Sequence, residues 1–279
     1  MNITTLLDKV YFAPRLKKID FYANRAGELQ HRVLDRLVRM AENTEWGKKY
    51  DYKSIHTYED FRNRLPIQTY EEVKPYVERL RAGEQNLLWP SEIRWFAKSS
   101  GTTNDKSKFL PVSKEALNDT HYQGGKDAVA LYLGQNPDSR FFSGQGLILG
   151  GSHSPNLNSR HGLVGDLSAI LIQNIHPLVN CVRVPSKKIA LMSDFEKKIE
   201  ANSAISKDVT SLSGVPSWML VLIKRILEKT GKQSLEEIWP NLEVFFHGGV
   251  AFTPYREQYK EVIRSPKMHY VETYNASEG

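Results

Sequence analysis

Two apolar runs in this chain each end in a pair of glycines, and they are its strongest indication of fold class. Residues 141–150 lead into Gly150-Gly151, and residues 243–247 lead into Gly248-Gly249. Short runs rich in aromatic and branched residues predict buried strands. Open α/β sheets bind ligands at the carboxyl ends of their strands, so flexible backbone there predicts a binding edge. Taken singly, either glycine pair is equally consistent with a tight turn.

Helical patterns precede and separate the strands. Leu29, Val33, Leu37 and Met40 recur at helical spacing, and capping boxes begin at Thr57 and Thr69. We predict strands at 93–98, 108–112, 141–150, 243–247 and 269–274, and helices at 114–133, 187–201, 216–229 and 254–264. The predicted fold class is α/β, with layered sheets carrying helices on their faces and a helical N-terminal section before them.

Bulk properties exclude several classes of protein. With 279 residues, 40% hydrophobic and 25% charged, the chain is long and apolar enough for a sizeable core. The net charge is +6, but the basic residues are scattered along the sequence and do not form the basic stripe that a nucleic-acid partner requires. The longest apolar run is stopped by Lys224, and the single cysteine, Cys181, is expected to be small and buried. We expect a cytoplasmic protein with no membrane partner; its oligomeric state stays open. The eight histidines lack paired ligand spacing, so no zinc site is predicted.

A hydroxyl-rich segment lies between the first two predicted strands. Residues 99–103 read Ser-Ser-Gly-Thr-Thr, and Lys106 and Lys108 follow. Small hydroxyls, a glycine and lysines are the groups that can surround a phosphate. The loop is predicted to join two strands, whereas the phosphate-binding loop of nucleoside triphosphatases joins a strand to a helix. The spacing of its glycine and lysines also differs from that motif. An ordinary polar hairpin turn is the competing interpretation.

The last predicted strand runs into a second polar loop. Residues 274–279 read Tyr-Asn-Ala-Ser-Glu-Gly. An aromatic ring can stack on a purine, a serine can donate to a phosphate oxygen, and a carboxylate can hold Mg²⁺. A surface turn with a solvated Glu278 is the alternative.

Taken in order, these segments resemble the adenylate-forming superfamily of acyl-CoA synthetases and luciferases. Within it, the chain most resembles the auxin-responsive family of acyl acid amido synthetases of plants, and especially its bacterial relatives. The resemblance extends over essentially the whole chain. The segments that carry it are 99–103 with Lys108, 110–113, 214–218, 247–252 and 274–279.

The resemblance implies a two-step ligase reaction that uses ATP and Mg²⁺. A small-molecule carboxylic acid would form an acyl-adenylate, and the amine of an amino acid would then displace AMP to leave an amide. The site residues that it implies are Ser99, Ser100, Gly101, Thr102 and Thr103 around the triphosphate, Lys108 to neutralise it, Gly248, Gly249 and Val250 in the adenine slot, Tyr274 stacked on the base, Ser277 on the α-phosphate, Glu278 on Mg²⁺, and Tyr122 and Asp127 near the acyl substrate.

The chain departs from the family pattern in two ways. Asn104-Asp105 stand where family loops usually carry glycine, and Asp105 adds negative charge near the phosphates. The sequence also stops at Gly279, directly after the second loop. We therefore expect residues 1–90 to be the helical N-terminal section of the large domain and residues 91–279 to be an incomplete nucleotide-binding portion of it. The small C-terminal domain would be absent, and the chain alone inactive. An acyl- or aryl-CoA ligase and a non-catalytic nucleotide-binding remnant are the alternatives.

Overall fold

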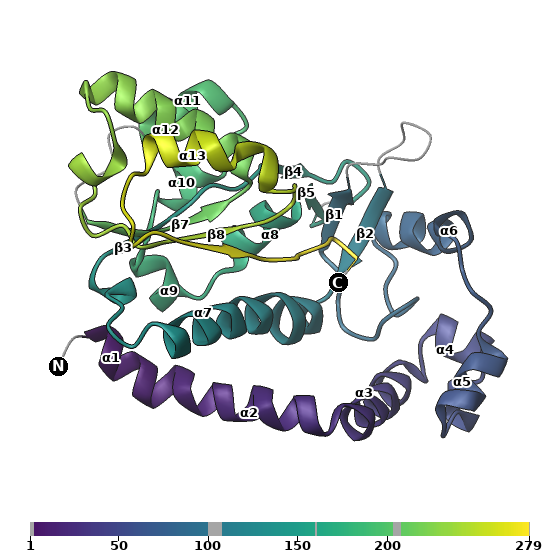
Figure 1. The fold of residues 1–279 in the computed structure, drawn as a ribbon. Coiled ribbons are helices and arrows are strands. Elements are labelled where there is room, and N and C mark those ends of the chain that lie inside the picture. The colour runs from purple at the N-terminus through teal and green to yellow at the C-terminus, as the bar shows by residue number, and fades with distance from the viewer. Residues whose placement is uncertain (1–2, 100–107, 160, 203–207, 279) are drawn as a thin grey trace.

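The computed structural model describes residues 3–99, 108–159, 161–202 and 208–278, and these form two sheets with helices on their faces (Figure 1). The four-stranded sheet has the order β2-β1-β5-β4, and the five-stranded sheet has the order β6-β3-β7-β8-β9. The α/β class with layered sheets is therefore confirmed. The strands are β1 Trp95–Ser99, β2 Lys108–Val112, β3 Gln145–Ile148, β4 His153–Pro155, β5 Leu163–Gly165, β6 Arg183–Val184, β7 Val209–Gly214, β8 Val244–His247 and β9 His269–Glu272.

The helices fall into an N-terminal group and a group that covers the sheets. The first group is α1 Ile3–Leu7, α2 Ala13–Asn24, α3 Ala26–Ala41, α4 Glu45–Lys49, α5 Tyr58–Arg64 and α6 Tyr70–Arg81. The second is α7 Gln123–Gln135, α8 Leu167–Asn174, α9 Pro177–Cys181, α10 Lys187–Ala190, α11 Phe195–Asn202, α12 Pro216–Thr230 and α13 Arg256–Val262. Two segments, Asp8–Phe12 and Ala116–Tyr122, are π-helical.

All neighbouring strands of the five-stranded sheet run parallel. The sequence that leads into β8 is a continuous apolar run because both faces of this strand are buried. Phe245 packs into the core that includes α12 and α13, whereas Val244 and Phe246 pack with α7 on the other face. Since the strands are parallel, the carboxyl ends of β3, β7, β8 and β9 meet at one edge of the sheet, as the glycine pairs predict.

The four-stranded sheet contains the predicted strand–loop–strand unit. Strands β1 and β2 pair antiparallel, with Ser99 opposite Lys108, and β1 also pairs parallel with β5. The loop that carries Ser100, Gly101, Thr102 and Thr103 lies outside the described residues. The described strands on either side show that the segment joins β1 to β2, which confirms that expectation.

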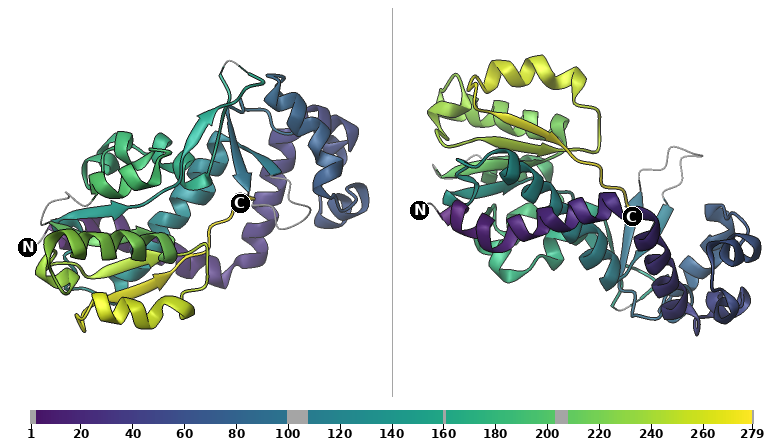
Figure 2. Two further views of the ribbon diagram at one scale, coloured as in Figure 1. Left: turned by 90° about the horizontal axis from the view of Figure 1, so that it is seen from above. Right: turned by 60° about the horizontal axis from the view of Figure 1, so that its bottom comes forward.

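The helical N-terminal section is confirmed, but most of the apolar positions that predicted α3 are exposed. Thr57 and Thr69 each form a complete capping box at the start of α5 and α6. In α3 the buried residues are Val38 and Ala41, while Val33, Leu37 and Met40 are between 36% and 46% exposed. Helices α4–α6 lie at one end of the molecule beside β1 and β2 (Figure 1 and Figure 2).

The structure corrects several sequence-based boundaries. Residues 141–143 form a 3-10 turn ahead of β3, and the helix predicted at 187–201 is divided into α10 and α11. Strands β4–β7 were not predicted. Strand β7 is central, yet its hydroxyl-bearing residues weaken the apolar pattern; the Thr210 hydroxyl donates to the Phe141 carbonyl at 2.6 Å, which lets it be buried. Cys181 is exposed at the end of α9, so its expected burial is wrong.

Candidate functional site

The loops that follow β8 and β9 are in direct backbone contact at the carboxyl edge of the five-stranded sheet. Thr273 donates to the His247 carbonyl from its backbone N–H at 2.7 Å and from its hydroxyl at 3.0 Å. A Cβ on Gly248 would lie 2.2 Å from the Thr273 carbonyl oxygen, a distance that no real contact reaches. Gly249 takes a φ of +83°, which side chains rarely adopt. The close approach of the two loops therefore requires glycine at position 248, and the left-handed backbone favours it at position 249.

The residues that the sequence assigns to a nucleotide base flank this contact. Val250 follows the glycine pair and is 42% exposed, and Tyr274 follows Thr273 and is 92% exposed. The Tyr274 ring therefore has both faces accessible for stacking. Ser277 is half-buried and Glu278 is exposed in the same loop. The structure thus places the predicted adenine-slot residues at one sheet edge, and their roles stay predictions.

The hairpin β1–β2 carries the predicted phosphate groups that the structure describes. Ser99 and Lys108 are paired across the hairpin, and the Lys108 ammonium lies 5.6 Å from the centre of the Tyr70 ring. In the described part of the chain, no hydrogen bond or ion pair joins Ser99 or Lys108 to Tyr274, Ser277 or Glu278. The meeting of the two loops around one ligand therefore stays a prediction.

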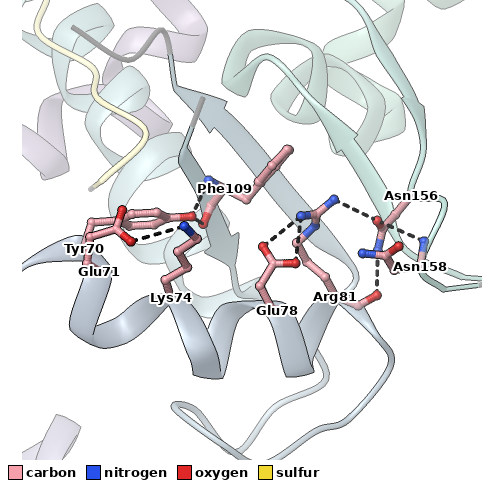
Figure 3. A network of polar contacts seen from close by, with 8 residues as sticks. All are labelled: Tyr70, Glu71, Lys74, Glu78, Arg81, Phe109, Asn156 and Asn158. Carbon is pink, nitrogen blue, oxygen red and sulfur yellow. Dashed lines mark hydrogen bonds and ion pairs between the residues drawn. The ribbon is translucent and has the colours of Figure 1, made fainter. Parts of the chain in front are cut away.

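Helix α6 fixes the strand that follows Lys108, as Figure 3 shows. The Tyr70 hydroxyl accepts a hydrogen bond from the Phe109 backbone N–H at 2.9 Å, and the Arg81 guanidinium lies 3.8 Å from the centre of the Phe109 ring. Arg81 also bonds Glu78 at 3.0 Å, and the Asn156 amide donates to the Arg81 carbonyl at 2.8 Å. The capping box at Thr69 predicts α6, but no local pattern predicts this support for Lys108.

A side-chain hydrogen bond connects the helix after β2 to the loop after β9. Ser113 caps this helix by accepting from the Ala116 N–H at 3.0 Å, and the first turns are π-helical. In the last π-helical turn, His121 Nδ1 lies 2.8 Å from Asn275 Oδ1. Sequence analysis had grouped His121 with dispersed histidines, because nothing in its local sequence points to a partner 154 residues away.

Tyr122 and Asp127, expected near the acyl substrate, both make internal contacts. The Tyr122 hydroxyl donates to the Leu171 carbonyl at 2.8 Å, and burial raises the pKa of Tyr122 to about 12. Burial acts to raise the pKa of Asp127, but hydrogen bonds from Arg15 and Gln123 outweigh it and hold that pKa below its usual range. Arg15 offsets the Asp127 charge, so the pair presents no net charge to an acid.

A pocket of about 250 Å³ opens at the carboxyl end of β3. Lys198 of α11 is buried there, and its ammonium donates to the carbonyls of Gly150 and Gly151 at 2.7 and 3.2 Å. Burial lowers the pKa of Lys198, and the neighbouring Asp166 charge partly opposes that effect. The pocket is lined by Gly151, Ser152, Asp166, Met192, Ser193, Lys198 and Trp218.

Two solved structures share the fold of this chain. The solved structure of the GH3.15 acyl acid amido synthetase matches with a TM-score of 0.73 at 17% identity, over 95% of this chain and 55% of that one. A 2-hydroxyisobutyryl-CoA ligase, solved with an acyl-AMP and CoA, matches with a TM-score of 0.50 at 12% identity, over 88% of this chain and 53% of that one. At such identities these likenesses establish the fold.

The chain belongs to the GH3 family, because the model of the GH3 family N-terminal domain matches residues 15–268. Indole-3-acetic acid-amido synthetase GH3.2 of Arabidopsis thaliana is 30% identical over 103 residues, which are 37% of this chain and 19% of that enzyme. Jasmonoyl-L-amino acid synthetase JAR4 of Nicotiana attenuata is 26% identical over 106 residues, 38% and 18% of the two chains. The chain spans about half the length of the amido synthetase structure that it matches.

No helix among the described residues is both long and apolar enough to cross a membrane. Among the same residues, no three or more His, Cys, Asp or Glu side chains gather as a metal-binding group.

Gly248→Ala tests the backbone contact between the two loops. The added methyl group would overlap the Thr273 carbonyl, so the loop after β9 has to move. We expect a lower thermal unfolding midpoint and faster amide hydrogen exchange at residues 273–278. Gly27→Ala is the control, because a Cβ there meets nothing within 4 Å and should stabilise α3 by about 1 kcal/mol. Wild-type exchange rates in Gly248→Ala would contradict the geometry.

His247 predicts a pH dependence of stability. Its ring is buried against Phe252, and burial lowers its pKa from the usual value of 6.5. The folded state therefore keeps the ring neutral, while the unfolded chain takes up a proton below about pH 6.5. The resulting stabilisation is complete above that pH and is lost as the pH falls toward the folded-state pKa.

The variant His247→Phe keeps the stacking and removes the titration. Urea denaturation between pH 7 and pH 5 should show a smaller loss of unfolding free energy than in the wild type, by up to about 1.4 kcal/mol per pH unit. The exposed His31→Phe serves as the control. Equal slopes for wild type and His247→Phe would refute the assignment.

Proposed function

We propose that this chain forms the nucleotide-binding part of an ATP- and Mg²⁺-dependent acid–amino acid ligase. Membership of the GH3 family supports the reaction class, since the relatives it matches are named indole-3-acetic acid-amido synthetase and jasmonoyl-L-amino acid synthetase. The observation that carries the assignment is the contact between Gly248 and Thr273, because it joins the glycine pair to the Tyr-Asn-Ala-Ser-Glu loop.

ATP would be held from two sides in this proposal. The phosphate side comprises Ser99, Ser100, Gly101, Thr102, Thr103 and Lys108, whose hydroxyls and ammonium suit phosphate oxygens. The base side comprises Gly248, Gly249, Val250 and Tyr274, where bare backbone and an exposed ring suit a purine. Ser277 is assigned to the α-phosphate. Helix α6 would keep Lys108 in place through its contacts to Phe109.

Glu278 is the assigned ligand of Mg²⁺. Its carboxylate is exposed, and Mg²⁺ is usually held by one or two carboxylates together with substrate phosphates and water. A single accessible carboxylate beside a phosphate site therefore fits this ion without a dedicated cluster of protein ligands. When bound, Mg²⁺ would neutralise phosphate charge.

We assign the acid to the pocket that Trp218 lines. Val215 directly precedes α12, and its side chain lies 3.3 Å from the Cβ position of Gly249. The start of α12 therefore connects the two parts of the proposed site, because Trp218 lines the pocket and Val215 contacts the glycine pair. Tyr122 and Asp127 are retained as further contacts to the acyl substrate from the helix after β2.

The chemistry follows from positioning and charge neutralisation. A carboxylate oxygen of the acid attacks the α-phosphorus of ATP, and the bond to pyrophosphate breaks. The neutral amine of the amino acid then attacks the acyl carbon, an amide bond forms, and AMP leaves. Neither step needs a nucleophile from the protein, so hydroxyls, an ammonium and backbone N–H groups are sufficient machinery.

Calorimetric titration with ATP and Mg²⁺ tests the nucleotide site in this chain. We expect weak binding in the wild type and a loss of about fivefold to 150-fold in affinity for Tyr274→Ala, because base stacking contributes about 1–3 kcal/mol. Tyr58→Ala on α5 removes another exposed tyrosine and should bind as the wild type does. Equal affinities for Tyr274→Ala and the wild type would contradict the base-side assignment.

Activity assays separate the alternatives. In a form of the protein that exchanges pyrophosphate into ATP, Ser100→Ala and Glu278→Ala should each abolish the exchange. Release of AMP on addition of amino acids supports an amido synthetase, whereas release on addition of CoA supports an acyl- or aryl-CoA ligase. Absence of ATP binding would favour a non-catalytic remnant.

A further inference from the structure

The loop after β9 has two hydrogen-bonded anchors in the described part of the chain. Its first residue, Thr273, is bonded to the end of β8 through the His247 carbonyl. Its middle residue, Asn275, is bonded to His121 on the helix that follows β2. Figure 1 shows the loop leaving the sheet and running toward β1, β2 and the start of α7. The second anchor therefore ties the loop to the structural unit that carries Lys108.

The hydrogen bond between His121 and Asn275 requires a proton on one particular nitrogen of the His121 ring. Asn275 Oδ1 is a carbonyl oxygen and only accepts, so the Nδ1 atom of His121, 2.8 Å away, carries the donated proton. The His121 side chain is half-buried, while Asn275 is exposed. His121 belongs to the π-helical segment Ala116–Tyr122. A π-helical turn rotates the following side chains relative to a regular α-helix, and such turns are frequent at functional sites.

We propose that His121 is a positioning residue that orders the nucleotide-binding loop 273–278 through its hydrogen bond to Asn275. This inference rests on the proposed function, because that function assigns Tyr274 to the base and Ser277 to the α-phosphate. Asn275 is adjacent to Tyr274 and two residues before Ser277. Fixing it restricts both assigned residues before the nucleotide arrives.

The size of the effect follows from the cost of ordering a loop. Fixing the backbone of each loop residue costs conformational entropy, and the exposed side chains of Tyr274 and Asn275 offset little of that cost by burial. If the loop is ordered before the nucleotide binds, less of the free energy of nucleotide binding is lost to ordering it. One net hydrogen bond changes an equilibrium by about threefold to tenfold.

The test is a double-mutant cycle with two readouts. His121→Ala and Asn275→Ala should each speed amide hydrogen exchange at residues 274–278 by about threefold to tenfold and weaken ATP binding by a similar factor. The double variant should match the single variants, because both remove the same bond. His121→Asn keeps an N–H donor at the position of Nδ1 and should restore most of the lost protection. Thermal unfolding should change little, which separates positioning from general stability.

Asn118→Ala, on the exposed side of the same π-helical segment, is the matched control and should resemble the wild type. Wild-type exchange and affinity in both single variants would overturn the inference, as would additive effects in the double variant. If the wild-type chain binds no ATP, the proposed function fails, and the exchange readout still decides whether His121 orders the loop.

Discussion

The site depends on two backbones that approach each other more closely than any side chain would allow. The carbonyl of Thr273 occupies the space where a Cβ of Gly248 would stand, and Thr273 is bonded twice to the His247 carbonyl. Parallel pairing of β8 and β9 delivers both loops to the same edge. The chain continues from this contact into the loop that carries the exposed Tyr274 ring and the half-buried Ser277.

The hydrophobic core on both faces of β8 fixes the position of this sheet edge. Strand β8 places Phe245 on one face and Phe246 on the other. Helices therefore pack on both faces of the strand that precedes the glycine pair. Tyr259 of α13 is fully buried beside Phe245, and its hydroxyl donates to the Pro216 carbonyl at the start of α12. The ends of β7 and β8 are thereby set relative to each other by packing on their helices.

Much of this architecture was predictable from local pattern, and the rest was not, for identifiable reasons. Capping boxes, apolar runs and glycine pairs are local signals, and they gave the helical section, β1, β2, β8 and β9. Strand β7 escaped because buried hydroxyls such as Thr210 are satisfied by partners distant in sequence. The partner of His121 and the support from Tyr70 escaped for the same reason. The Lys198 pocket joins segments whose adjacency no spacing encodes.

The buried ammonium of Lys198 has a thermodynamic consequence for the pocket at the end of β3. It bonds the carbonyls of Gly150 and Gly151, so a helix holds the segment after β3, which lies 47 or 48 residues earlier in the chain. The wall of the cavity that Lys198 provides is therefore in place only while α11 is docked. Any molecule that occupies it is linked by mass action to the local unfolding of that helix, and it would protect α11 in proportion to its affinity.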